Sequence, residues 1–527
     1  MSKLAIARAF VLALIVVGLT AGPTLPARAQ DADVSKQLEA LRRHVEELER
    51  RDREKGRRIE ELEEQLERLD AGQKATGAPA RAVSPTRPGP PTEAPQSPQD
   101  ALDAAIADIE KSAAPAAAAT PSDLWSRQIG AARLRLIDIS LDVLAAAGGS
   151  TVDDDVLQDL QGGAHDPRKN GFTLQQAELG FAGAVDPYFR AETYIVYSLD
   201  PIEGESVVEI EEAFATTQSL PWGLELEAGH FFTEFGRINP RHPHQWEWQD
   251  QPVVNTRLFG GDGMRAPGAR IGWLTPLPWF SELHYGIQNA NGETMVSFLA
   301  NDEVFEERAI GGRPFTDRDV DGIGDLVHLA RWDNSWDLTP QTAVKVGLSG
   351  LYGPNPTGED AETWIYGADF VAKWRGARSL RGWPFLLLQA EIMRRDYEAA
   401  GFTFEAEPDD PADDVAVAGD TLHDWGLYTQ ALYGFDLGWA AGLRFDWADG
   451  DGAGFDPETA ELVGRGDDPF RDRRWRLSPL LAWYPTEFSR LRLQYNYDDA
   501  DHLDDGHAHS MWLGLEVLFG AHPAHKF

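Results

Sequence analysis

Period-two alternation is the dominant pattern over the last four hundred residues of the chain. In SRLRLQYNYDD, residues 489–499, leucine and tyrosine occupy every second position, and arginine, glutamine and asparagine occupy the positions between them. Successive side chains of a β-strand point to opposite faces, so this stretch predicts a strand with one apolar and one charged face. The alternation recurs in WGLELEAG, ETWIYGADFVAKW, WAAGLRFDWADG and MWLGLEVLF, where aromatic residues favour the ends of the apolar face. Aromatic residues at these positions are typical of strands that cross both interfaces of a membrane.

About sixteen such segments follow one another along the chain. They are expected at 131–147, 171–184, 188–199, 206–217, 222–235, 266–274, 279–290, 325–333, 341–352, 363–375, 383–396, 423–435, 437–449, 472–484, 488–499 and 509–519. Connections after even-numbered segments are short, whereas those after odd-numbered segments include the long stretches 236–265, 291–324, 397–422 and 449–472. Turns at one end and long loops at the other are typical of outer-membrane barrels. The predicted fold is all-β, a transmembrane antiparallel barrel of about sixteen strands with both chain ends on the periplasmic side.

The two faces of these strands are expected to meet different surroundings. Closure of a barrel satisfies every backbone hydrogen bond, so the apolar face can meet lipid while the charged face lines a water-filled lumen. At about sixteen strands the interior is too wide for side chains to fill, and conduction is expected. A soluble β-sandwich also alternates, but it explains the rhythm of long and short loops less well.

The first 129 residues have a different texture. Residues 1–29 resemble a signal peptide, with a basic start, the apolar run AFVLALIVVGLTAG and the cleavage pattern Ala27-Arg28-Ala29. Residues 30–70 predict a periplasmic coiled coil, because apolar heptad positions persist from residue 38 to 69, with a solvated single helix as the alternative. Residues 71–129 form a linker rich in proline and alanine, and residues 130–527 form the barrel. The coiled coil predicts a homo-oligomer, or a periplasmic or cell-wall partner.

Composition excludes several classes of protein. The chain has 86 acidic and 48 basic residues and a net charge of −38, which opposes nucleic-acid binding. It contains no cysteine, so disulfides and thiolate metal sites are excluded. Much of the acidity falls in the expected outer loops, for example in EAEPDDPADD and DDADHLDD. Acidic mouths favour cations, and the predicted channel therefore prefers them.

The charged positions expected to line the pore segregate into two walls. The acidic wall, from the second to the fifth strand, comprises Glu178, Glu192, Glu209, Glu211, Glu225 and Glu227. The basic wall, from the thirteenth to the fifteenth strand, comprises Arg444, Arg474, Arg476, Arg490 and Arg492. Opposed walls would create a transverse electric field, whereas the plainer interpretation is that each charge simply solvates the lumen.

The long loop after the fifth strand is a candidate constriction. Its sequence RINPRHPHQWEW places His242, His244, Trp246 and Trp248 where a loop folded into the barrel would narrow it.

Two outer loops carry candidate metal ligands. The first, DRDVDGIGD, spaces its oxygen ligands like a calcium loop at Asp317, Asp319, Asp321 and Asp325, although His328 stands where an EF-hand has glutamate and no flanking helices are expected. The second, DADHLDDGHAH, offers ligands suited to Zn²⁺ at His502, Asp504, Asp505, His507 and His509. The alternative for both is a solvated loop tip. No cofactor is required, and Ca²⁺ or Zn²⁺ in outer loops is the candidate addition.

Two stretches carry a resemblance to a known group. Residues 230–293, from HFFTEFGRINPRHPHQWEW to FSELHYGIQNANGE, and the ending WLGLEVLFGAHPAHKF resemble Gram-negative outer-membrane porins. More narrowly, they resemble the porin-like proteins known as zinc-regulated outer-membrane proteins. The resemblance covers roughly 171–527 and implies a porin of the outer membrane. Phe527 is similar to the terminal aromatic that such barrels present to their assembly machinery, although GAHPAHK separates it from the last clear strand.

The sequence therefore predicts a non-enzymatic porin for passive diffusion of small solutes or ions, divalent metals among them. Neither G-x-S-x-G nor H-E-x-x-H occurs. One alternative is a structural anchor in the outer membrane, tethered to the periplasm or cell wall by the coiled coil. Another is a zinc-related uptake receptor. A plugged receptor of the energy-coupled type is disfavoured, because residues 30–129 leave no room for a globular plug.

Overall fold

The computed structural model describes residues 126–129, 132–135, 137–200, 204–318, 320–404, 415–452 and 468–520. The chain divides into two compact units, Met1–Pro115 and Ala116–Phe527, and all described residues belong to the second. The expected signal peptide and coiled coil, nearly all of the linker, and Phe527 lie outside the described residues.

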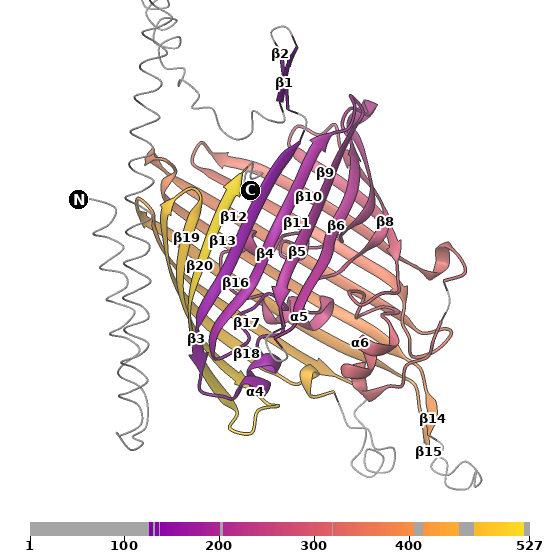
Figure 1. The fold of residues 1–527 in the computed structure, drawn as a ribbon. Helices are drawn as coiled ribbons and strands as arrows, with labels where there is room; N and C mark the ends of the chain where they lie inside the picture. Colours follow the sequence, from indigo (N-terminus) through magenta and orange to yellow (C-terminus); the bar gives the residue numbers. More distant parts are fainter. Residues whose placement is uncertain are drawn as a thin grey trace, which may run out of the picture. The chain divides into compact units, whose positions relative to one another are not determined.

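Sixteen antiparallel strands close into a barrel (Figure 1). They are β3 (Asp138–Ser150), β4 (Gly171–Ala184), β5 (Phe189–Leu199), β6 (Ser206–Thr217), β7 (Leu224–Phe232), β8 (Arg265–Leu274), β9 (Phe280–Asn289), β10 (Leu326–Thr339), β11 (Thr342–Pro354), β12 (Glu362–Leu380), β13 (Trp383–Ala399), β16 (Asp420–Asp436), β17 (Trp439–Asp451), β18 (Arg474–Thr486), β19 (Ser489–Ala500) and β20 (His507–Gly520). Each pairs with its neighbours in chain order, and β20 pairs with β3, with Leu515 opposite Ala145. The predicted closed antiparallel barrel is confirmed.

Smaller elements lie outside the sixteen barrel strands. Two hairpins, β1 (Ser126–Ile129) with β2 (Ala132–Arg135) and β14 (Phe402–Phe404) with β15 (Val415–Val417), form separate two-stranded sheets. The connections carry the helices α4 (Asp154–Leu160), α5 (Val253–Phe259) and α6 (Asp302–Glu307), and 3-10 turns at Pro221–Gly223, Pro243–Gln245, Ile310–Gly312, Ile323–Asp325 and Pro469–Arg471. Within the described part of the chain, no helix has the length and apolarity needed to cross a membrane. The first barrel strand begins at Asp138 rather than at 131, because residues 132–135 pair with β1 instead.

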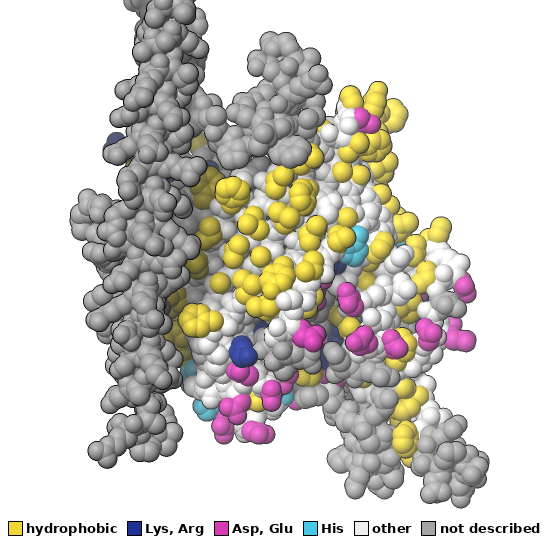
Figure 2. Space-filling view, in the orientation of Figure 1, with side chains coloured by type: hydrophobic (Ala, Val, Ile, Leu, Met, Phe, Trp, Pro, Cys, Tyr) yellow, Lys and Arg dark blue, Asp and Glu magenta, His cyan; other side chains and the backbone are white. Residues whose placement is uncertain are grey.

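The outward face of the barrel is apolar. On β19 and β20, Leu493 and Leu513 are more than a third exposed, whereas Arg492 and Gln494, next to Leu493 in sequence, are buried. Figure 2 shows hydrophobic side chains spread over the strands and acidic side chains gathered toward the end that carries the long loops. The alternation therefore separates outside from inside as the sequence predicts.

The interior differs from the open lumen that the sequence predicts. The connection between β7 and β8, residues 233–264, enters the barrel and is called the crossing loop below. A buried cluster joins Phe235 and Leu258 of this loop, and Phe298 of the next long connection, to wall residues such as Leu329 and Ile365. The wall encloses a space too wide for its own side chains, and these two connections fill much of it.

Candidate functional site

The crossing loop turns into the barrel immediately after β7. Gly236 adopts a positive φ of 66°, and a Cβ there would lie 2.0 Å from a carboxylate oxygen of Glu391. The other oxygen of Glu391 accepts a hydrogen bond from the backbone N–H of Ile238 at 3.1 Å. The chain therefore bends where only glycine is unstrained, and the next residues are held by the opposite wall.

His242 ties the crossing loop to the acidic side of the barrel. Its Nδ1 lies 2.7 Å from Glu211 and 3.1 Å from Glu178, and its Nε2 lies 2.8 Å from Glu212. Burial alone would lower the pKa of His242, but the carboxylates of Glu178 and Glu211 outweigh it and raise the pKa well above its usual value. The residue is therefore an imidazolium: its Nε2 donates to Glu212, and its Nδ1 makes ion pairs with Glu211 and Glu178.

His244 extends the same cluster. Its Nδ1 lies 3.1 Å from Asp142 and 3.3 Å from Glu178, and its ring stacks on that of His242 at 5.6 Å. Burial lowers the pKa of His244, yet Glu178 and Asp142 leave it raised. Trp246 and Trp248 are also buried in the barrel. The four side chains proposed for a constriction thus lie inside the barrel and are packed against its wall.

Asp250 anchors the far end of this segment on the basic side. Its two carboxylate oxygens accept from Arg444 at 2.7 Å and from Arg476 at 2.8 Å, and also from Gln494 at 2.8 Å and Asn496 at 3.0 Å. Burial raises the pKa of Asp250, but Arg444 and Arg476 outweigh this and lower the pKa to about 2. Sequence reasoning missed this residue. In the sequence Asp250 is visible only as an acidic residue next to the aromatic QWEWQ segment. Nothing in the pattern indicates that it pairs with arginines on the opposite wall.

Backbone contacts complete the span across the barrel. The indole of Trp248 donates to the backbone carbonyl of Ser478 at 2.9 Å. The side-chain amide of Gln249 donates to the backbone carbonyls of Arg492 and Trp512, each at 3.2 Å. The crossing loop therefore bridges from the β4–β6 wall to β18–β20.

The five arginines of the expected basic wall all lie inside the barrel and all have partners. Besides the pairs with Asp250, Arg474 bonds Asp498 at 2.7 Å and Arg490 bonds Glu516. Arg492 donates to the carbonyls of Trp248 and Trp246 at 2.8 and 3.2 Å. Local pairing therefore reduces the charge that this wall presents to a solute.

The acidic wall is compensated in the same way. Arg270 lies 3.3 Å from Glu225 and 3.0 Å from Glu227. Glu209 pairs with Arg265 at 3.0 Å and Glu192 with Arg190 at 3.0 Å, while Glu178 and Glu211 hold the histidines. Sequence reasoning placed these residues by alternation and missed their partners, Arg190 on β5 and Arg265 and Arg270 on β8.

Neither predicted metal loop brings three of its described ligands together. Asp325 bonds Arg318 at 2.9 Å and accepts from the backbone of Asp321, while Asp319 lies outside the described residues. Of the second set, His507 is exposed and His509 half-buried at the start of β20, with ring centroids 5.8 Å apart, and burial together with Arg474 lowers the pKa of His502 to about 4. Among described residues, the groups that bring three ligand atoms within 4.8 Å are His165–Glu209–Asp262 and Glu178–Glu211–His242; they include neither Asp317 nor Asp504.

Two larger cavities lie inside the barrel toward the short-turn end. One of about 330 Å³ is bounded by Lys373, Arg381 and Trp383 among others, and one of about 550 Å³ by Glu192 and Glu225 among others. They share four lining residues, Arg237, Arg241, Gln245 and Lys345. The charged side chains of the first are mainly basic and stand among apolar ones, whereas the second is lined by both acidic and basic side chains.

Comparison with known proteins adds the following. No family model matches the chain. An uncharacterized protein of Aquifex aeolicus (strain VF5) is 29% identical over 372 residues, covering 68% of this chain and 71% of that protein.

Several solved outer-membrane proteins are similar in structure. OprB of Pseudomonas putida has a TM-score of 0.45 at 13% identity, covering 73% of this chain and 94% of that one. The outer membrane channel DcaP of Acinetobacter baumannii has a TM-score of 0.42 at 11% identity, with 73% and 97% covered. An anion-selective porin of Comamonas acidovorans has a TM-score of 0.39 at 10% identity, with 73% and 98% covered. At these values none of the similarities carries a function over, and none bears on the zinc-regulated group that the sequence resembles.

Proposed function

We propose that this chain is an outer-membrane porin that admits small hydrophilic solutes or ions by a narrow route, with its N-terminal region in the periplasm. The observation that carries the proposal is the pair of adjacent, charge-lined cavities inside a closed barrel whose exterior is apolar. Apolar side chains outside and charged ones inside suit lipid on one face and water on the other. Lipid is thus the first partner, and a homo-trimer is the preferred assembly.

Cation preference in this proposal arises at the outer mouth. The chain carries 86 acidic and 48 basic residues, and acidic side chains gather at the long-loop end (Figure 2). Inside the barrel the acidic side chains Glu225 and Glu227 are offset by Arg270. An exposed acidic mouth concentrates cations over about 10 Å at 0.1 M salt, so the preference weakens as salt rises.

A second candidate is a structural barrel that anchors the periplasmic segment and conducts little. The specific observation in its favour is the buried cluster that joins the crossing loop to the wall. Packed interiors leave few voids larger than water, so a route past this cluster needs the loop to move or must run around its edge.

Planar-bilayer recording of the full-length protein separates the two candidates. A porin should give discrete conductance, and a reversal potential in a KCl gradient that indicates cation preference. Arg241, which borders both cavities, provides the internal test. Arg241→Ala should raise conductance by widening the shared boundary, whereas Arg473→Ala, at an exposed arginine of the outer end, should leave it unchanged.

Each outcome has one interpretation. Absence of wild-type current favours the anchor. Current that is indifferent to Arg241→Ala rejects the route through the cavities. A wild-type preference for anions assigns selectivity to the basic cavity rather than to the mouth.

A further inference from the structure

His165 is a buried histidine. Among the described residues, one of its ring nitrogens has a hydrogen-bond partner and the other has none. The residue lies in the β3–β4 connection and is 3% exposed. Its Nδ1 lies 3.3 Å from the carbonyl oxygen of Gln175, while none of the described residues forms a hydrogen bond with Nε2. A carbonyl only accepts, so Nδ1 carries a proton, and the lone pair that the neutral ring offers to a metal is the one on Nε2. A carbonyl behind the ring is the usual support of a metal-binding histidine.

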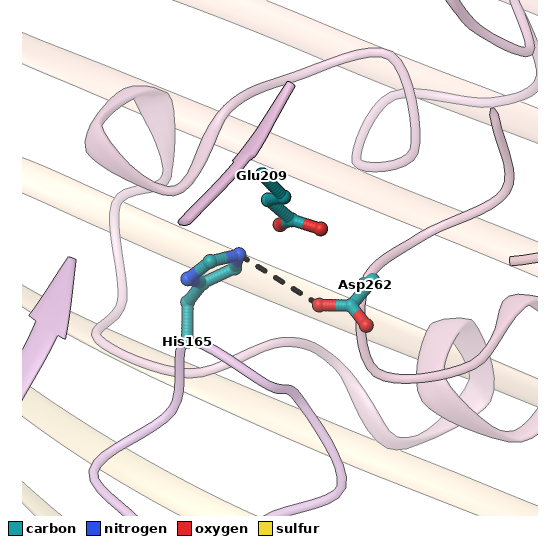
Figure 3. A group of neighbouring side chains, drawn as sticks. All are labelled: His165, Glu209 and Asp262. Atoms are coloured by element: carbon teal, nitrogen blue, oxygen red, sulfur yellow. Dashed lines mark ion pairs between the residues drawn. The ribbon is translucent and has the colours of Figure 1, made fainter. Parts of the chain in front are cut away.

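Three carboxylates lie around Nε2 of His165, and two of them, Glu209 and Asp262, are drawn in Figure 3. Asp262 and Glu211 each place an oxygen 3.9 Å from His165 Nε2. Glu209 completes a group in which one ligand atom from each of His165, Glu209 and Asp262 lies within 4.8 Å of the others. A cavity of about 10 Å³ is lined by His165, Glu211 and Asp262, the space of a single water or ion.

Two β-bulges shape the wall at this point. The register of β4 on β3 skips Gln175, whose carbonyl meets His165, and the register of β6 on β5 skips Glu211. At each bulge two successive side chains are buried, Gln175 with Gln176 and Glu211 with Glu212. Bulges concentrate near functional sites because they re-aim side chains. Strict alternation hides them, which is why the sequence pattern did not reveal Glu212 or this group.

The backbone around His165 is held by the crossing loop. Asp166 accepts from the backbone N–H of Gln251 at 2.9 Å, and Ala164 N–H donates to the carbonyl of Gly261 at 3.1 Å. The amide of Gln175 donates to the carbonyls of His165 and Gln249 at 2.6 and 3.0 Å. His165 therefore faces Asp262 from a fixed position.

The local charge balance favours a cation. Arg265 lies 3.0 Å from Glu209, and His242 holds the other oxygen of Glu211. These two cations offset two of the three carboxylates, so the group keeps one uncompensated carboxylate beside the imidazole. The other three-ligand group is unsuitable, because both nitrogens of His242 are already within 2.7–3.1 Å of carboxylates.

We propose that His165, Glu209 and Asp262, with Glu211 beside them, bind a first-row divalent transition metal such as Zn²⁺. One imidazole and several carboxylates suit this class, whereas Ca²⁺ and Mg²⁺ prefer oxygen alone. Metal–ligand bonds of about 2.0–2.2 Å place ligands roughly 3 to 4 Å apart, so the donors need to approach by only about 1 Å. The ion links the β3–β4 connection, β6 and the crossing loop, and the proposal does not depend on conduction.

The test is binding of Co²⁺ and Zn²⁺ to the tag-free, full-length protein treated with chelator. Wild type should bind one equivalent of Co²⁺ with a visible absorption band that Zn²⁺ abolishes, and Zn²⁺ but not Ca²⁺ should raise the melting temperature. His165→Ala should weaken binding at least about tenfold, as loss of a ligand or its support does. His507→Ala, an exposed outer-loop histidine, should have no effect.

A second variant protects the test against misfolding. The side chain of Asp262 is 41% exposed, so Asp262→Asn should fold and still lose affinity. Absence of a Co²⁺ band in wild type, unchanged affinity in Asp262→Asn, or loss of the band in His507→Ala instead would each overturn the proposal.

Discussion

The sharpest test of the crossing loop is Asp250→Asn. The substitution keeps the shape of the side chain but removes the charge shared by Arg444 and Arg476 and replaces one acceptor oxygen by a donor. Breaking a buried ion pair from one side costs about 3–5 kcal/mol. Both arginines keep a second carboxylate, Asp446 and Asp498, each at 2.8 Å. We therefore expect Asp250→Asn to destabilise the docked loop by the lower end of this range, about 3 kcal/mol. This corresponds to a change on the order of a hundredfold in the equilibrium between the docked and the open loop.

Cysteine labelling measures that equilibrium directly. The chain has no cysteine, so Val254→Cys places a single thiol at a fully buried position of α5, four residues after Asp250. If the loop opens and recloses quickly, the rate of modification by a water-soluble maleimide is proportional to the open fraction. Adding Asp250→Asn should speed labelling on the order of a hundredfold. Asp504→Asn, an exposed outer-loop change, is the matched control.

One outcome would refute the reasoning. If the Asp250→Asn variant is labelled at a rate within about threefold of the Val254→Cys parent while the barrel remains intact, the ion pairs of Asp250 with the two arginines do not hold the loop. Acidification does not imitate the substitution, because the pKa of Asp250 is about 2 and its stabilising charge is lost only as pH falls through that value.

Three further predictions concern pH, selectivity and assembly. Because the pKa of His242 is raised, its stabilisation of the loop is complete below the unfolded pKa of about 6.5 and is lost as pH rises through the higher folded value. Labelling of the Val254→Cys thiol should therefore accelerate at alkaline pH. In the His242→Gln variant the same thiol should be labelled rapidly at all pH values. Glu225→Gln with Glu227→Gln uncovers Arg270 and should lower the cation-to-anion permeability ratio, by about twofold at low salt and less at high salt, in reversal-potential measurements; an unchanged ratio would place selectivity elsewhere. Leu41→Asp with Leu62→Asp should reduce the native mass of the oligomer, because charge at heptad core positions is costly, and an unchanged mass would speak against a coiled coil.

Sequence pattern was sufficient for the wall of the barrel and insufficient for its contents. The segments expected at 171–184 and 206–217 coincide with β4 and β6, because period two follows directly from one face in an apolar and one in a polar environment. The same alternation arises whether the polar face meets water or a folded loop. In the sequence pattern Arg444 and Arg492 cannot be distinguished from pore-lining arginines, yet both are buried against the crossing loop.

The missed site residues share a physical cause. Asp250 and His165 lie in connections, where no periodicity indicates which wall a side chain will meet. Glu212 lies at a bulge, where the rule that predicts its neighbours fails. The length of the connection between the fifth and sixth segments was the signal that placed this loop inside the barrel, and length does not identify the partners of its side chains.

The path of the crossing loop also constrains how the protein can assemble. Its partners lie far ahead in the chain: Trp248 meets Ser478 230 residues later, and Gln249 meets Trp512 263 residues later. Contacts of such long sequence separation form late, because the intervening chain must first be ordered. Until β17–β20 are synthesised and paired, the loop can contact only the earlier strands, and Trp248, Gln249 and Asp250 lack their partners on the basic side. Seating of the loop is therefore among the last events of folding, and a chain truncated before β18 would leave its central segment exposed to proteases and to aggregation.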